Sequence, residues 1–466
     1  MAVNFPSPST KSGTTILLWV ICLSSSLTPF LGSALNLALP YINEEFSISA
    51  TLSGWIPAAF MLSTAILQIP CAKLADMVGR KKIFLLGTSL ILMFCVLSGL
   101  ASSAISLIIY RFLTGVGSAM VFGTSNALLM TAVPLEKRGM ALGINTAVVY
   151  FSLSAGPFLG GILTQYLGWH SIFFFSALIA LLVLIGGILF IHDDWREEAQ
   201  HKFDFGGSVL YAMGLTGGIY GFSVLPSLVG FLALLGGMII LAFFCLYEKN
   251  QDNPVFNVRV FWSNRVFKFS SLAALISYSA TFATSFILSL YLQYVRGLSP
   301  RDAGLILISQ SLVQAFAALY SGKLSDKKSP ASLATLGMAI ISVGLVGLCF
   351  ITETTSFYLI AALLLPIGIG IGVFSSPNMN VLMSSVEKKY YGLASATAGT
   401  MRLVGQSLSM GIAMMAISFT IGKVPFSPEV HSGIMSSLQI TFIVCSILCF
   451  IGIYASSVRG RDKSKN

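Results

Sequence analysis

Apolar runs of about 20 residues recur along the whole sequence, and short segments that hold most of the charge separate them. A run of about this length is what an α-helix needs to cross the hydrocarbon core of a bilayer. Only 9% of the residues are charged, whereas soluble domains carry about 25% charged residues. The sequence therefore predicts an all-α polytopic membrane protein.

The apolar runs divide into fourteen expected spans, with a polar tail at each end of the chain. The tails cover residues 1–13 and 458–466. The spans cover residues 14–39, 51–71, 83–101, 104–131, 139–164, 170–191, 205–223, 228–247, 269–294, 303–322, 332–351, 356–383, 391–421 and 436–457. Because the number is even, both tails are expected on the same side of the membrane.

The positive charges indicate which side that is. Of the 27 lysines and arginines, 22 lie in the tails and the loops on their side, 3 in the opposite loops and 2 inside spans. Basic loops stay in the cytoplasm, so we expect both termini there, in a cell inner (plasma) membrane. The cations that give the formal charge of +10 thus set orientation in the lipid bilayer, and no nucleic acid partner is expected.

An internal repeat indicates how the spans are grouped. The sequence GKLSD at residues 322–326 follows the tenth span as AKLAD at residues 72–76 follows the second. Two six-helix bundles related by parallel duplication are therefore expected, at residues 14–191 and 269–457. The linker, residues 192–268, would hold two inserted helices and an interfacial segment.

The loop after the second span carries Asp76, Gly79, Arg80 and Lys81, and Asp326 is the counterpart of Asp76 in the second repeat. This pattern resembles the signature loop of the major facilitator superfamily. The resemblance implies a gate in which Asp76 faces the positive amino-terminal end of span thirteen in one conformation only. The alternative is a loop whose solvated ion pair merely sets topology.

Two arginines lie inside spans. Arg111 begins a pattern that resembles the second motif of the superfamily, and Arg402 lies one helical turn before Gln406. An arginine within the membrane needs a cavity or a partner. We expect these residues to contact substrate or a proton path; for Arg111 the alternative is a staple bonded to backbone carbonyls.

The fifth span holds small residues at intervals that let a second backbone approach closely. They are Gly143, Ser152, Gly156, Pro157, Gly160 and Gly161. The set resembles the antiporter motif of exporters, which implies export. Ordinary packing of small residues is the alternative.

Uncharged polar residues within the spans are possible cavity-lining residues, and each is equally suited to bonding helices together. They are Asn36, Gln68, Asn126, Asn145, Gln310, Gln314 and Asn378. No carboxylate lies well inside a span, and Leu31 occupies the position where relatives in the drug-exporter branch carry an aspartate. A buried carboxylate is the natural proton carrier and the natural counter-charge for a cationic drug. Its absence, together with the two arginines inside spans, favours a neutral or anionic substrate.

Fourteen spans with a mid-chain pair resemble the drug:proton antiporter branch, which includes quaternary-ammonium and tetracycline exporters. The resemblance implies a secondary active transporter that exports a small organic molecule by alternating access and proton antiport. The alternatives are a facilitator or anion-coupled carrier using both arginines, and, more distantly, a non-transporting sensor. The seven cysteines lack metal-ligand spacing, and no nucleophile–base pair, HExxH or other metal-binding pattern appears. No soluble segment is long enough to carry catalysis, so we expect no metal, no cofactor and no enzyme. A monomer is expected.

Overall fold

The computed structural model describes residues 11–133, 138–191, 203–251, 254–325, 327–387, 391–422, 424 and 430–459. Every regular element within these ranges is helical, which confirms the all-helical prediction. Twelve of the described helices are long and apolar enough to cross a membrane, and helix α6 joins them if its two bent parts form one span. Helix α8 is not among them, so the count of fourteen spans stays a prediction.

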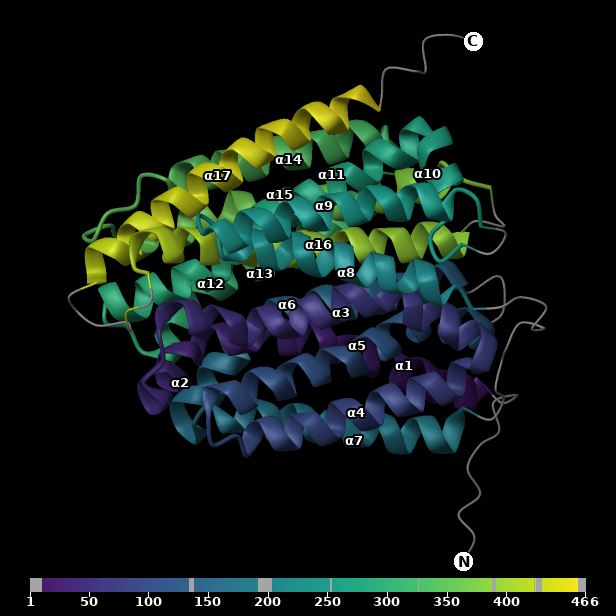
Figure 1. Cartoon of the computed structure of the whole chain (residues 1–466), viewed down its shortest axis with the longest axis horizontal. Helices are drawn as coiled ribbons and strands as arrows, with labels where there is room; N and C mark the ends of the chain where they lie inside the picture. The colour runs from purple at the N-terminus through teal and green to yellow at the C-terminus, as the bar shows by residue number, and fades with distance from the viewer. Residues whose placement is uncertain are drawn as a thin grey trace, which may run out of the picture.

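Two bundles with the same internal arrangement make up most of the molecule (Figure 1). The first contains α1 (Lys11–Ser33), α3 (Ala50–Val78), α4 (Arg80–Gly99), α5 (Ala104–Ala132), α6 (Arg138–Leu167) and α7 (His170–Phe190). The second contains α11 (Arg265–Thr281) with α12 (Ala283–Leu290), α13 (Pro300–Leu324), α14 (Pro330–Leu348), α15 (Phe357–Ser384), α16 (Tyr391–Thr420) and α17 (His431–Val458).

Equivalent helices make equivalent contacts in the two bundles. In the first, α3 and α4 pack on α5, α4 packs on α7 and α1 packs on α6. In the second, α13 and α14 pack on α15, α14 packs on α17 and α11 packs on α16. This is the arrangement that a parallel duplication produces. The bundles meet along two seams, where α6 packs on α13 and α3 packs on α16.

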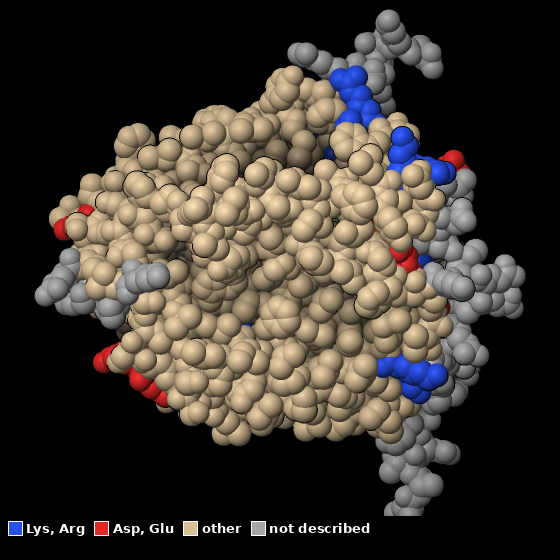
Figure 2. All heavy atoms as spheres, viewed as in Figure 1, with Lys and Arg blue, Asp and Glu red and all other residues tan. Residues whose placement is uncertain are grey.

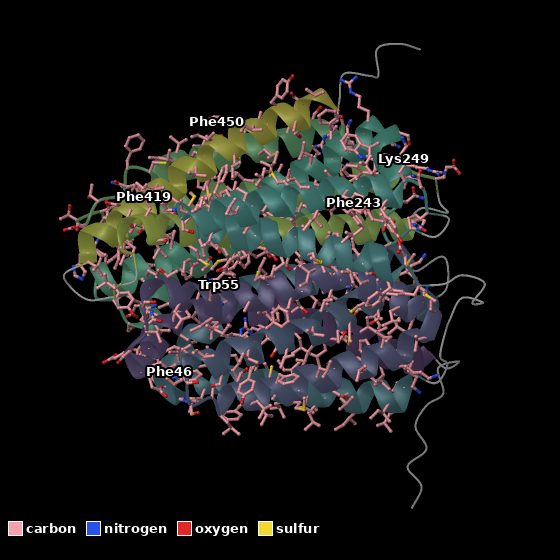
Figure 3. All side chains as sticks on the ribbon, in the orientation of Figure 1. Phe46, Trp55, Phe243, Lys249, Phe419 and Phe450 are labelled. Atoms are coloured by element: carbon pink, nitrogen blue, oxygen red, sulfur yellow. The ribbon has the colours of Figure 1, made fainter. Side chains whose placement is uncertain are left out.

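Helices α8 (Phe205–Ser223) and α9 (Leu228–Glu248) form a pair that covers the seam between α3 and α16. The ring of Tyr220 on α8 lies 5.7 Å from that of Trp55, which Figure 3 places on α3 between the bundles. Tyr211 on α8 donates a hydrogen bond of 3.3 Å to the carbonyl of Ala65. The short helix α10 (Val258–Ser263) follows the pair and leads into α11.

The surface has an apolar middle and charged ends (Figure 2). Lysines and arginines gather at the end where α17 stops, and the charged side chains visible at the opposite end are acidic. Phe243 and Phe450 are each more than half exposed on the middle of the surface (Figure 3). An exposed apolar band between polar ends is what a bilayer requires of the protein surface. We call the cation-rich end the inner end and the opposite end the outer end.

Two expected spans contain local breaks in the α-helical hydrogen-bond pattern where the bundles meet, although each remains one candidate span. Residues 14–39 form α1, a 3₁₀ turn η1 (Ala34–Leu37) and the start of α2 (Leu39–Phe46). Residues 269–294 divide into α11 and α12, and a π turn η3 (Tyr291–Val295) follows. Side chains satisfy the backbone groups near these breaks: Ser409 accepts from the Ala283 amide at 2.9 Å, and Ser289 donates to the Asn36 carbonyl at 2.9 Å. Irregular backbone is tolerated at such depth because protein surrounds it.

Candidate functional site

A cavity of about 50 Å³ lies between the two bundles, at the level of the broken helices. Its lining residues come from both bundles, and none of these described residues carries a charge. They are Ser33, Asn36, Leu153, Tyr278, Thr281, Phe282, Ser285, Gln310, Ser311, Gln314, Ile371 and Gln406. The volume holds a few water molecules, whereas pockets for drug-sized ligands measure about 300–1,000 Å³. The conformation is therefore a contracted one.

The first bundle contributes an amide that lacks hydrogen-bond partners. Asn36 lies in the 3₁₀ turn and is 1% exposed. Neither its amide nitrogen nor its amide oxygen is hydrogen-bonded to a described residue. A buried polar atom left unpaired costs about 1–3 kcal/mol, so this side chain needs hydrogen-bond partners from within the cavity, such as water.

The second bundle contributes three glutamines. Gln310 and Gln314 are one turn apart on α13, and Gln406 lies on α16. Helix α15 approaches α13 closely because Gly368 and Gly372 face the carbonyls of Gln310 and Gln314, where a Cβ would overlap them. These glycines, in the run at residues 368–372, therefore pack helices. The side-chain oxygen of Gln310 is buried and has no hydrogen-bond partner among the described residues.

A pair of tyrosines connects the bundles beside the cavity. The hydroxyl groups of Tyr150 on α6 and Tyr278 on α11 are 3.0 Å apart. Tyr278 was not among the residues predicted from sequence, and it lines the cavity with other unpredicted residues from the break in span nine. These are Thr281, Phe282 and Ser285. The concentration of hydroxyl residues between 277 and 285 was the signal that could have identified them.

Hydrogen bonds between the bundles close the outer end of the molecule. The Ala50 amide donates to the Val424 carbonyl at 3.1 Å, and Thr51 donates to the Gly422 carbonyl at 2.9 Å. Nearby, the side-chain amide of Asn43 donates to the hydroxyl of Tyr294 at 3.2 Å. These bonds hold the two bundles together at the outer end in this conformation.

Arg111 is fully buried inside the first bundle and does not line the cavity. Its guanidinium donates to the carbonyls of Leu31 at 3.0 Å and Ile56 at 3.4 Å, and lies 4.3 Å from the centre of the Phe60 ring. These are the contacts of a staple between α1, α3 and α5. A role for Arg111 in a proton path stays a prediction.

Arg402 and Gln406 occupy different surroundings although they are one turn apart. Gln406 lines the cavity, whereas the guanidinium of Arg402 lies 4.7 Å from the centre of the Phe122 ring on α5. This cation–π contact joins the two bundles across the interface. Arg402 therefore provides a fixed positive charge near the cavity.

The loop between α3 and α4 contains a local ion pair. Arg80 donates to Asp76 at 2.8 Å across the break between the helices. Gly79 at the break has φ of 125°, a conformation that side-chain-bearing residues rarely adopt, so the turn requires glycine. The expected contact of Asp76 with the start of span thirteen stays a prediction, and Asp326 lies outside the described residues.

Helix α6 bends by 40° between Ala147–Leu153 and Ala155–Leu167. Pro157 follows the bend, where proline removes a helical hydrogen bond. A Cβ on Gly156 would overlap Ser33, and one on Gly160 would overlap the backbone of Ala34. The second glycine of the Gly-Gly pair, Gly161, faces the carbonyl of Pro300 on α13 in the same way. The small residues therefore let α6 contact both bundles. Two residues of the predicted set do not take part in these contacts. Ser152 donates a hydrogen bond of 2.8 Å to the carbonyl of Val148 in its own helix, and Gly143 lies nearer the start of α6.

The other predicted polar residues lie away from the cavity lining. Gln68 on α3 faces Gly399 on α16 at the seam, Asn145 is buried on α6, and the side chain of Asn126 lies outside the described residues. Asn378 hydrogen-bonds Arg459 and the carbonyl of Ser270 inside the second bundle. Burial lowers the pKa of Arg459 to about 10, which leaves it charged at neutral pH.

No cluster of three or more histidine, cysteine, aspartate or glutamate side chains that could hold a metal occurs in the part of the chain that the structure describes.

Comparison with known proteins gives a consistent result. The profile of the Major Facilitator Superfamily matches residues 21–410. The riboflavin transporter RibZ of Clostridioides difficile is 28% identical, over 96% of this chain and 98% of the relative. The tetracenomycin C resistance and export protein of Streptomyces glaucescens is 26% identical, over 83% and 73%. The multidrug resistance protein Stp of Mycobacterium tuberculosis is 27% identical, over 81% and 71%.

Among solved structures, a bacterial homologue of the human lysosomal transporter Spinster, in an inward-facing and unoccupied conformation, matches with a TM-score of 0.67 at 19% identity. The match covers 97% of this chain and 98% of that one. It shows the shared fold.

Proposed function

Because this chain belongs to the Major Facilitator Superfamily, we propose that it is a secondary active transporter that moves a small uncharged organic molecule by alternating access. The family and the similar proteins are transporters rather than enzymes. The observation that carries the proposal is the cavity between the bundles, whose described lining is polar but uncharged. Such a lining binds a ligand through hydrogen bonds and has no charge to compensate a charged one.

The contacts between the bundles support a gating cycle. The bonds from Ala50 and Thr51 to the 422–424 segment hold the outer end closed. Rocking of one bundle against the other would break them, open the cavity outward and close the inner end. The expected role of Asp76 is to bias this equilibrium at the inner end. Because the cavity is small when contracted, the ligand enters as the bundles separate.

We propose export as the direction and the plasma membrane as the location, with the protein acting as a monomer. The small residues of α6 resemble the antiporter motif of exporters, and two of the similar proteins are named as export or resistance proteins. Proton antiport would then need a carboxyl outside the cavity lining, or a proton carried by the substrate. Glu248 is a candidate carboxyl: it is 2% exposed at the inner end of α9 and accepts from the Val255 amide at 3.2 Å.

Transport of a riboflavin-like metabolite is the second candidate function. The riboflavin transporter matches over nearly the full length of both chains, whereas the exporters match over less of each. Riboflavin is uncharged, as the cavity lining is. The sequence leaves two further alternatives: a facilitator or anion-coupled carrier that uses Arg111 and Arg402 as positive sites, and, more distantly, a non-transporting membrane sensor.

A pH-jump experiment on proteoliposomes separates these functions. Vesicles containing the purified protein are loaded with a transported compound, and its movement is followed with and without an imposed proton gradient. Proton antiport predicts faster export when protons can flow inward. Rates that are indifferent to the gradient would exclude proton coupling and favour a facilitator, and sustained export of a cationic drug alone would contradict the proposed uncharged substrate.

A further inference from the structure

The hydrogen-bonding side chains that line the cavity are four amides and five hydroxyls. Asn36 comes from the first bundle, and Gln310, Gln314 and Gln406 come from the second. Each amide presents an N–H donor and a carbonyl acceptor side by side in one plane. In Asn36 both atoms lack a hydrogen-bond partner among the described residues, and in Gln310 the oxygen does. A ligand that satisfies such a side chain must offer an acceptor and a donor at neighbouring positions.

A charged group fits this set poorly. An ammonium can only donate and a carboxylate can only accept, so either would leave one atom of each amide unpaired. Either would also enter a lining without an opposite charge, and an uncompensated buried charge is strongly unfavourable. The guanidinium of Arg402 is engaged with the ring of Phe122 rather than lining the cavity.

The remaining lining residues describe the rest of the ligand. Phe282 and Tyr278 are aromatic, and Leu153 and Ile371 are aliphatic. Flat apolar surfaces beside amides suit a planar ring whose faces are apolar and whose edge is polar. An aliphatic polyol has no such faces.

We propose that the cavity recognises uncharged planar heterocycles that carry a lactam or imide edge, with an N–H donor adjacent to a C=O acceptor, and that Asn36 and Gln406 read that edge from opposite bundles. This assignment rests on the proposed transport function and names its substrate class. Because Asn36 and Gln406 belong to different bundles, a ligand bound to both would also connect the two bundles.

The test measures binding to the purified full-length protein in lipid nanodiscs. The probes are uracil, lumichrome and riboflavin, the analogue of each that is methylated on the imide nitrogen, the cation tetraphenylphosphonium and the anion fluorescein. We expect at least one uncharged probe to bind, and its methylated analogue to bind about tenfold or more weakly because one donor is lost. The cation and the anion should bind more weakly than that probe.

Variants assign the effect to the cavity. Asn36→Ala and Gln406→Ala should each weaken the best probe by about tenfold and reduce the discrimination against its methylated analogue. Gln439→Ala is the matched control, since Gln439 is exposed on α17, and it should bind as the parent does. Elution of each variant as a single species by size-exclusion chromatography shows that it is folded. If one cavity variant fails this check, binding to the other cavity variant tests the proposal.

Three results would overturn the assignment: equal binding of methylated and unmethylated probes, tighter binding of a charged probe, or no binding of any uncharged probe. Uptake of the same probes into proteoliposomes separates this failure from failure of the proposed function. Transport of charged probes alone would overturn the ligand class and leave transport intact. Binding of an uncharged probe without transport of any probe would support the ligand class and overturn the transport function.

Discussion

Removing a single hydroxyl at the outer end should increase the fraction of molecules whose outer end is open. Thr51 donates one hydrogen bond of 2.9 Å to the Gly422 carbonyl across the bundle interface. Valine has nearly the same shape and cannot donate, so Thr51→Val removes this bond with little change in packing. A hydrogen bond contributes about 1 kcal/mol net, which predicts an increase of about fivefold in the ratio of outer-open to outer-closed molecules.

A second substitution should multiply the effect. Asn43→Ala removes the bond of 3.2 Å to the Tyr294 hydroxyl, and if the two bonds act independently the double variant shifts the ratio by about 25-fold. Thr88→Val is the matched control, because the Thr88 hydroxyl bonds at 2.8 Å to Phe84 within its own helix. It should leave the ratio unchanged.

The assay is the distance distribution between spin labels on cysteines that replace Tyr41 and Tyr358, which are exposed at the outer ends of the two bundles. Native cysteines that take up label are replaced by serine. The Thr51 variant should enlarge a long-distance population that is small in the parent. An unchanged distribution in the double variant, or an equal shift in the Thr88 control, would refute the assignment of these bonds to an outer gate.

Other substitutions test the remaining residues. Asp76→Asn should leave insertion intact and bias the carrier toward one gate, and equal thiol accessibility of both cavity faces in variant and parent would refute this. Arg402→Ala should abolish transport of an anionic substrate and spare a neutral one; unchanged kinetics for every substrate would remove Arg402 from the site. Arg111→Met should lower the free energy of unfolding by about 1–3 kcal/mol through two orphaned carbonyls, seen as a lower melting temperature, and an unchanged value would contradict the staple. Gly160→Ala should lower the free energy of unfolding by about 1–3 kcal/mol, because the added Cβ would overlap the backbone of Ala34. Gly218→Ala should leave the free energy of unfolding unchanged, because nothing lies within 4 Å of its added Cβ. Equal effects of the two substitutions would contradict the packing argument.

Apolar runs and charge placement predicted the helical membrane architecture because both report directly on the bilayer. They could not predict the breaks in the first and ninth spans. Those breaks depend on tertiary partners, such as Ser409 for the Ala283 amide and Ser289 for the Asn36 carbonyl. Tyr278 and Phe282 were missed because they carry no charge or amide that marks them in sequence, although they line the cavity.

Polar residues in apolar spans were good candidates for the site because burial requires them to find partners. Asn36, Gln310, Gln314 and Gln406 do line the cavity, but Asn378 is equally buried and bonds Arg459 instead. The sequence could not distinguish these cases, since Arg459 follows its span and reaches back into the bundle. For Arg111, the sequence left both interpretations open, and its bonds to the carbonyls of Leu31 and Ile56 are those that a staple would make.

The position of Leu31 connects these observations. Its backbone carbonyl accepts a hydrogen bond from Arg111, so the arginine is held without a carboxylate on α1. The first bundle thus holds one buried positive charge that no carboxylate on α1 neutralises. This arrangement agrees with the uncharged lining of the cavity, because neither site offers a negative charge for a cationic drug.

The central claim is that the amide-lined cavity is opened alternately to the two sides of the membrane. The direct measurement uses a single cysteine at Gln406 in a background without other reactive cysteines, and a membrane-impermeant thiol reagent added to one side of sealed vesicles at a time. The account predicts reaction from the inner side in the parent, and added reaction from the outer side when Thr51→Val and Asn43→Ala open the outer end. If the cysteine reacts from only one side, and that side is the same in the parent and in the variant, the claim of alternating access is contradicted. Reaction from neither side would also contradict it.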